Sequence, residues 1–214
     1  MNMTPTTSPS TPTQNLYTDT PPAWMNYLWG AFVALVALFL VWGGLTLMAD
    51  MSRRQIQKEY LLLTDDASRA SFAKRHANHP LGGLILLGQA HDYYASGNYA
   101  AAKEAYAKAV NSGLKNEPVL NEEAILGEAF STFALNTDQG LAALKAIAQN
   151  TQLMDTTRAH AAGELLGYWA AQAKTTGDWS QARDYWALMK TFKNAKPWQQ
   201  HVAPLGEIYP QLVQ

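Results

Sequence analysis

Histidines and carboxylates are the side chains of this sequence whose spacing could support chemistry. His76 and His79 form an H-x-x-H pair, and two imidazoles spaced in this way can share one face of a helix. A zinc ion needs at least a third protein ligand, and the sequence contains no cysteine to supply one. We therefore interpret the pair as two solvent-facing histidines at the end of a helix.

The other carboxylate pairs have simpler structural explanations than catalysis. His160 and Glu164 are spaced i, i+4 in an alanine-rich segment, where such a pair is usually a surface contact. Glu122 and Glu123 follow Asn121 and precede an apolar run, which is typical of a capped helix N-terminus. The signatures G-x-G, G-x-x-x-x-G-K-[ST], H-E-x-x-H and G-x-S-x-G are absent. The sequence therefore predicts no catalytic, cofactor-binding or metal-binding residue, and a protein that is not an enzyme.

One long segment near the start of the sequence is uncharged and apolar. Residues 20–49 contain no Asp, Glu, Lys or Arg, and residues 27–48 are almost wholly apolar. A helix of this length reaches ~33 Å, enough to cross the ~30 Å hydrocarbon core of a bilayer. The apolar core is too long for a signal peptide and lacks a basic segment before it. We predict a transmembrane helix over residues 24–49 that contacts the lipid bilayer through residues 27–48.

The segments on either side of this helix differ in composition. Residues 1–23 are rich in Thr, Ser and Pro, which predicts a disordered tail. Residues 50–79 read as a juxtamembrane helical linker, in which Thr64-Asp-Asp-Ala provides a helix cap. Residues 80–214 carry helical periodicity without strand-like alternation, so the whole chain is expected to be all-α.

The charge distribution bears on orientation and on partners. All sixteen Lys and Arg residues lie at or after Arg53, and Arg53, Arg54 and Lys58 follow the apolar segment directly. The positive-inside rule then places the carboxy-terminal domain in the cytoplasm. The net charge of the chain is −1, which gives no electrostatic reason to expect nucleic acid as a partner.

A tetratricopeptide-like pattern begins at Pro80. Its small residues would let two antiparallel helices approach closely, its tyrosines would fill the space around them, and its glycine would supply a positive φ at the turn between the helices. The residues at these signature positions are Ala90, Tyr93, Gly97, Tyr99, Ala102 and Tyr106.

A second copy of the pattern lies near the end of the chain, at Gly177, Trp179, Ala182 and Trp186. Between the two copies, residues 124–129 and 141–145 indicate the helices of a degenerate repeat, with a longer turn over residues 136–140. About three helical hairpins are therefore expected, which is near the minimum for a stable stack.

The aromatic residues of these repeats could line a peptide-binding groove or fill the core. Those at signature positions pack one helix of a hairpin against the other, and core filling explains them. Tyr94 and Trp169 lie outside that role and are the candidates for a partner-binding groove.

This arrangement resembles the YfgM-like tetratricopeptide family of bacterial single-pass membrane proteins. The resemblance covers roughly residues 27–190 and rests on four segments of the chain: Phe72-Ala-x-x-His-Ala-Asn-His-Pro-Leu, Gly97-Asn-Tyr-x-Ala-Ala, Ala142-Ala-Leu-Lys and Gly177-Asp-Trp-x-Gln-Ala-Arg. It implies residence in the bacterial plasma membrane beside the Sec translocon, with the soluble domain in the periplasm, where it would receive exported proteins together with chaperones. That family carries its positive charges before the span, so the charges of this chain and the resemblance favour opposite sides, and both placements stay open.

Two functions are compatible with these features. The first is a membrane-anchored protein–protein interaction module, an adaptor or chaperone-like accessory protein that binds protein partners in or near the membrane without a cofactor. The alternative is a structural accessory subunit of a larger membrane complex that docks through its transmembrane helix.

Overall fold

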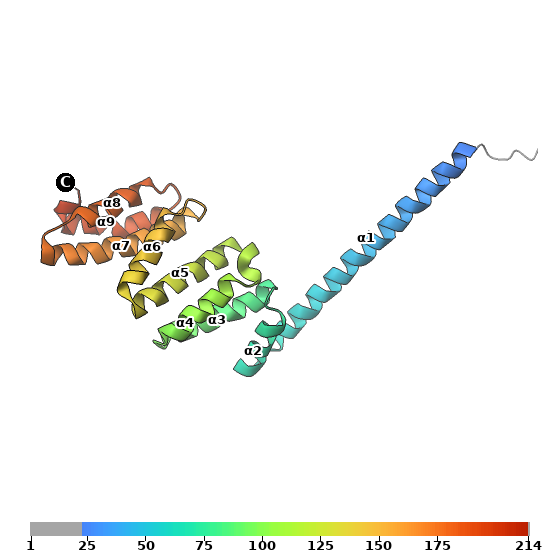
Figure 1. Ribbon diagram of the computed structural model, residues 1–214, viewed down its shortest axis with the longest axis horizontal. Coiled ribbons are helices and arrows are strands. Elements are labelled where there is room, and N and C mark those ends of the chain that lie inside the picture. Colours follow the sequence, from blue (N-terminus) through green and yellow to red (C-terminus); the bar gives the residue numbers. More distant parts are fainter. Residues whose placement is uncertain (1–22, 214) are drawn as a thin grey trace, which may run out of the picture. The chain divides into compact units, whose positions relative to one another are not determined.

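The computed structural model describes residues 23–213, with the side chains of residues 31, 32 and 34–213 placed (Figure 1). Within that range the chain forms nine α-helices and two short 3-10 helices, and no strand. The prediction of an all-α protein is confirmed. Residues 1–22 of the tail that is predicted to be disordered lie outside the described residues.

The first helix, α1 (Ala23–Leu61), is one continuous helix. Within its described part, the stretch Ala34–Leu61 is long and apolar enough to cross a membrane. Most of its large apolar side chains are exposed, and those of Leu38, Phe39 and Leu40 are about 70% exposed. The chain divides into two compact units, one reaching to Ile56 and the other running from Gln57, and each is described by itself.

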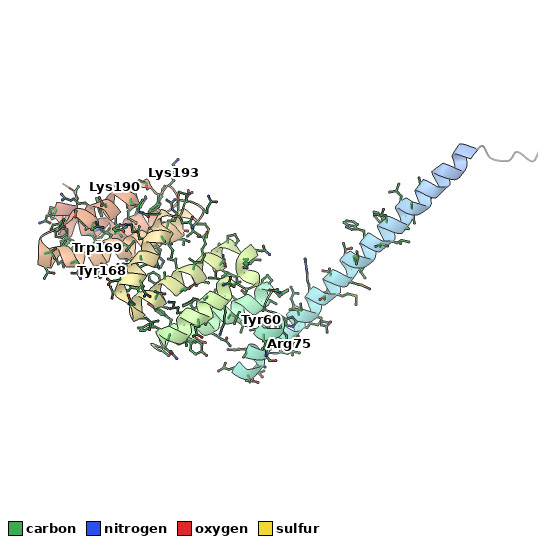
Figure 2. The ribbon with its side chains drawn as sticks, viewed as in Figure 1. Tyr60, Arg75, Tyr168, Trp169, Lys190 and Lys193 are labelled. Carbon is green, nitrogen blue, oxygen red and sulfur yellow. The ribbon has the colours of Figure 1, made fainter. Side chains whose placement is uncertain are left out.

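The second unit opens with a small helical corner. Helix α2 (Asp66–Arg75) begins at the predicted cap, because Asp65 and Ser68 exchange side-chain to backbone hydrogen bonds in a capping box. The carboxylate of Glu59 pairs with Arg75, which is labelled with Tyr60 in Figure 2. Phe72 is fully buried, with the ring of Tyr60 edge-on at a centroid distance of 5.9 Å. These contacts fix α2 on the final turn of α1.

Seven further helices form the rest of this unit. From α3 to α8 each helix contacts the next along the chain. Contacts of α3 with α5, of α5 with α7 and of α7 with α9 place these four helices in one row. Figure 1 shows α3, α4 and α5 side by side. The bounds are α3 (Pro80–Ala95), α4 (Tyr99–Val110), α5 (Pro118–Leu135), α6 (Thr137–Gln149), α7 (Asp155–Thr176), α8 (Ser180–Thr191) and α9 (Lys196–Ile208), with 3-10 turns η1 (Gly113–Asn116) and η2 (Pro210–Leu212).

Two glycines and one asparagine lie at short turns between consecutive helices. Gly97 and Gly177 have φ values of 77° and 75°, the left-handed conformation that an ordinary residue adopts only at a cost. The positive φ predicted for Gly97 is confirmed. The longer turn predicted over residues 136–140 is wrong, because Asn136 alone joins α5 to α6 as the C-cap of one and the N-cap of the other.

Small side chains let these helices lie close together. Ala90 and Ala102 are fully buried between α3 and α4, as their positions in the pattern predict. At Gly127 in α5 there is no side chain at all, and the ring of Tyr106 fills the place where a Cβ would stand. One core cluster holds α3, α4 and the first half of α5 together, and a larger cluster extends from α5 to η2.

Candidate binding groove

Residues of α3, α5, α7 and α9 line an open groove with a volume of about 330 Å³. Each of the four helices contributes an aromatic or imidazole ring: His91 from α3, Phe130 from α5, His160 from α7 and Trp198 from α9. Tyr106 belongs to α4 but reaches the groove over Gly127, because that glycine leaves room for its ring.

The spacing of residues along α5 and α7 explains why they share this surface. On α5, Val119, Glu123 and Phe130 are separated by four and seven residues, which places them on one face of a helix. On α7, Thr156 and His160 are separated by four residues and lie on the corresponding face. Val119 is 66% exposed at the rim, and Phe130 is only partly covered.

A ladder of rings forms one side of the groove. The imidazole of His160 stacks on the indole of Trp198 with centroids 4.0 Å apart and an interplanar angle of 21°. The ring of Phe130 is tilted against His160 with centroids 5.1 Å apart, and His201 meets the edge of Trp198 at 5.8 Å. Offset and edge-on ring contacts of this kind each stabilise by about 0.5–1.5 kcal/mol. The ladder therefore joins α5, α7 and α9 across the groove.

Carboxylates lie beside the rings. The Glu123 Oε1 atom is 3.3 Å from His91 Nε2, and the Glu164 Oε1 atom is 3.9 Å from His160 Nε2. Burial, and then the neighbouring His201, lower the pKa of His160 below its usual 6.5, so this imidazole is neutral at pH 7. Burial and the charge of Glu123 raise the pKa of Tyr106 to about 12, so its phenol keeps its proton. The groove thus combines aromatic surface with negative charge.

The chain matches no protein-family model, no curated protein and no solved structure. What the groove can bind is therefore argued from its own geometry and charge.

The two residues predicted to line a groove lie elsewhere on the helices. Of the described residues that line the cavity, none is Tyr94 or Trp169. Tyr94 is 37% exposed, stands edge-on to Tyr99 at 5.2 Å, and lies within electrostatic range of Glu164. Trp169 packs against the larger core and edge-on to Tyr168 at 5.2 Å, and the two are neighbours in Figure 2. Their role in partner binding stays a prediction.

The signature positions of the two repeats differ in burial. Tyr106 and Ala182 are buried, and Tyr99, Trp179 and Trp186 are partly buried. Tyr93 is 43% exposed, so the expectation that it fills space between two helices is wrong. In the second copy, the buried aromatic residue is Tyr185, which is 7% exposed, and not the neighbouring signature residue Trp186.

The residues considered for chemistry have structural partners. The expectation that His76 faces solvent is wrong. Its side chain is partly buried against Phe72 and lies 3.2 Å from the Glu59 carboxylate. His79 caps α3 by accepting a hydrogen bond from the Leu81 N–H at 3.2 Å. Among the described residues, no group of three or more His, Cys, Asp or Glu side chains could hold a metal ion.

Glu122 is also placed differently from its prediction. Helix α5 begins at Pro118, one turn before Asn121, so the predicted cap at Asn121 is wrong. Glu122 is 6% exposed, and its carboxylate accepts the backbone N–H of Met154 at the start of α7. The adjacent Glu123 faces the groove. Glu122 therefore stabilises the packing of α5 against the start of α7, whereas Glu123 is exposed in the groove.

The sequence pattern missed most of the groove. His160 and Glu123 each had an adequate local explanation, and only the packing of α3, α5 and α7 brings them together with His91. The sequence did contain one indication of the groove, the spacing of Val119, Glu123 and Phe130. This spacing places apolar and acidic side chains together on one helix face.

Proposed function

We propose that the protein is a membrane-anchored protein–protein interaction module, which holds itself in a bilayer through residues 27–48 and binds a segment of a partner protein in the groove. The single observation that supports this best is the groove itself, in which four helices present partly exposed rings beside the half-exposed carboxylate of Glu123. A concave surface of this kind binds peptides without covalent chemistry.

The proposed architecture of the binding domain is a tetratricopeptide-like stack. The antiparallel pairs α3–α4, α5–α6 and α7–α8 would be its three hairpins, and α9 its terminal cap. The left-handed glycines before α4 and α8 support this assignment, because both occur at the same position of the proposed repeat. In such a stack, partners bind along the first helix of each hairpin. Here these helices are α3, α5 and α7, and all three line the groove.

The proposed location is the bacterial plasma membrane, with one span. A reporter that is active in only one compartment, fused to Gln214, separates the two orientations. A cytoplasmic signal agrees with Arg53, Arg54 and Lys58 as the topological determinant. A far-side signal agrees with the YfgM-like resemblance and with a role beside the export machinery.

Site-specific photocrosslinking in intact membranes tests the proposal. A photoreactive amino acid at Val119, on the rim of the groove, should form a discrete adduct with a partner protein, and the adduct should disappear when Phe130→Ala is added. The matched control is the same amino acid at Ile208, which is similarly exposed (61%) but does not line the groove. Equal adducts at both positions, or an adduct that Phe130→Ala leaves intact, would contradict docking in the groove.

An exchange of the span separates this function from that of a structural subunit. Residues 27–48 are replaced by an unrelated transmembrane helix of equal length. An interaction module keeps the Val119 adduct after the exchange, whereas a subunit that docks through its span loses its complex.

A further inference from the structure

Two carboxylates lie in the groove or next to it. Glu123 lines the groove, whereas Glu164 lies outside the lining, one turn along α7 from His160. Glu123 and Glu164 are about half exposed, at 48% and 55%, and each lies near a histidine. Of the described residues that line the cavity, none is a Lys or Arg. The negative charge of this surface is therefore not neutralised by a permanent cation from the lining itself.

The histidine beside Glu164 does not neutralise it at pH 7. His160 is partly buried against Phe130 and Trp198, and burial disfavours its charged form. The neighbouring His201 acts in the same direction. A stronger base supplied from outside can therefore replace this imidazole as the partner of the carboxylate.

The rings next to the carboxylates suit the rest of such a ligand. A guanidinium or ammonium group is attracted to the face of an indole or phenyl ring, and the methylene stem of Lys or Arg covers apolar surface. Trp198 and Phe130 supply the rings, and Val119 at the rim supplies exposed apolar surface. Rings flanked by carboxylates recognise a base joined to an apolar chain.

We infer that the groove accepts a segment of a partner protein in which Lys or Arg side chains alternate with large apolar ones. The apolar side chain lies against Phe130 and Trp198, one basic group lies at Glu123 in the groove, and the next lies at Glu164 beside it. The inference rests on the proposed function of this groove. Residues 1–22 of the chain contain no Lys or Arg, so they lack the chemistry required of the occupant.

Three labelled peptides test the inference on the full-length protein in phosphatidylcholine nanodiscs. They share the same Leu and Phe residues and differ only in having Lys, Gln or Glu at the remaining positions. Fluorescence anisotropy at pH 8 measures their binding. We expect the Lys peptide to bind most tightly and the Glu peptide least. The double variant Glu123→Gln/Glu164→Gln should bind the Lys peptide about fivefold to tenfold more weakly, since two half-exposed ion pairs are lost, and the Gln peptide as before.

A matched control removes two carboxylates from the other layer of helices. Glu104 in α4 and Asp184 in α8 are exposed and do not line the groove, so Glu104→Gln/Asp184→Asn should leave the affinity for the Lys peptide within twofold of the wild type. Equal loss in both double variants would overturn the inference, because it would show a general effect of net charge.

Failure of the inference can be told apart from failure of the proposed function. If all three peptides bind alike and Phe130→Ala weakens them all, the groove is a docking site and the preference for bases is refuted. If no peptide binds while the Val119 adduct persists, the preference is again refuted and the docking function stands. If the protein sediments as a dimer that Phe130→Ala dissociates, a second copy occupies the groove and the inference is overturned.

Discussion

The carboxylate of Glu122 accepts the backbone N–H of Met154 through both of its oxygens, at 3.1 and 3.0 Å. The two residues lie 32 positions apart in the chain. This contact fastens the first half of α5 to the start of α7, and so sets the spacing of two helices that form the groove.

Replacement of Glu122 should therefore destabilise the domain. Glu122→Leu puts an apolar side chain of similar size in place of the carboxylate and leaves the Met154 N–H without its acceptor, which costs about 1–3 kcal/mol. Thermal unfolding of the full-length protein in mild detergent, followed by tryptophan fluorescence, measures the change. The control is Glu123→Leu, at a neighbouring site that is half exposed, which should change stability by less than about 0.5 kcal/mol. Equal effects would contradict separate roles for the two carboxylates.

A methyl group at Gly127 should disturb the contact between α4 and α5. Its Cβ would fall within the ring of Tyr106, so Gly127→Ala should destabilise by about 1–3 kcal/mol through overpacking. The same change at Gly167 meets nothing within 4 Å and should stabilise α7 by about 0.5–1 kcal/mol. Urea titrations of the two variants give opposite shifts if the close approach is real.

The left-handed conformation of Gly177 should carry a cost for any other residue. A Cβ at this position meets no atom within 4 Å, so the effect of Gly177→Ala is that of the backbone alone, at φ 75°. We expect a loss of about 1–2 kcal/mol. Gly177→Asn should lose less, since asparagine tolerates this conformation. An alanine variant as stable as the wild type would show that the turn has another geometry.

Acidification should weaken the domain through His160. Burial and His201 lower its pKa in the folded protein below the unfolded value of about 6.5. Between those two values the unfolded chain binds the proton more readily, so stability falls as the pH drops below 6.5 and stops falling below the folded pKa. The carboxylate of Glu164 is more than half exposed at 3.9 Å and does not outweigh burial.

The comparison with His160→Phe isolates this contribution. Phenylalanine keeps a ring against Trp198 and cannot titrate, while every other ionisable group is unchanged. The difference in unfolding free energy between the two proteins should shift in favour of the variant as the pH falls from 7.5 to about 5.5. A shift in favour of the wild type would mean that pairing with Glu164 governs this histidine.

Features set by neighbouring residues could be predicted from the sequence. The capping box at Asp65 and the left-handed glycine at Gly97 each depend on a few consecutive residues, and the structure has both. The prediction placed the start of α5 too late, because Asn121 followed by two acidic residues resembles a helix cap. Helix α5 begins at Pro118, and proline favours the first turn of a helix.

The groove could not be predicted in the same way. Its composition depends on which faces of α3, α5, α7 and α9 meet, and a shift of one residue along any helix would turn its face away by ~100°. Tyr93 and Tyr94 show this sensitivity. The two are adjacent in α3, and the pattern assigned the first to the core, yet it is 43% exposed.

The single-residue joint at Asn136 limits how the length of this chain can change. Because α5 ends and α6 begins at the same side chain, an inserted residue there would rotate one helix against the other, and Gly140 already lies against the backbone of Phe133. The glycine turns at Gly97 and Gly177 are exposed and have open space around them. Epitope tags, cleavage sites and natural insertions should accordingly be tolerated at these two turns and rejected at the joint between them.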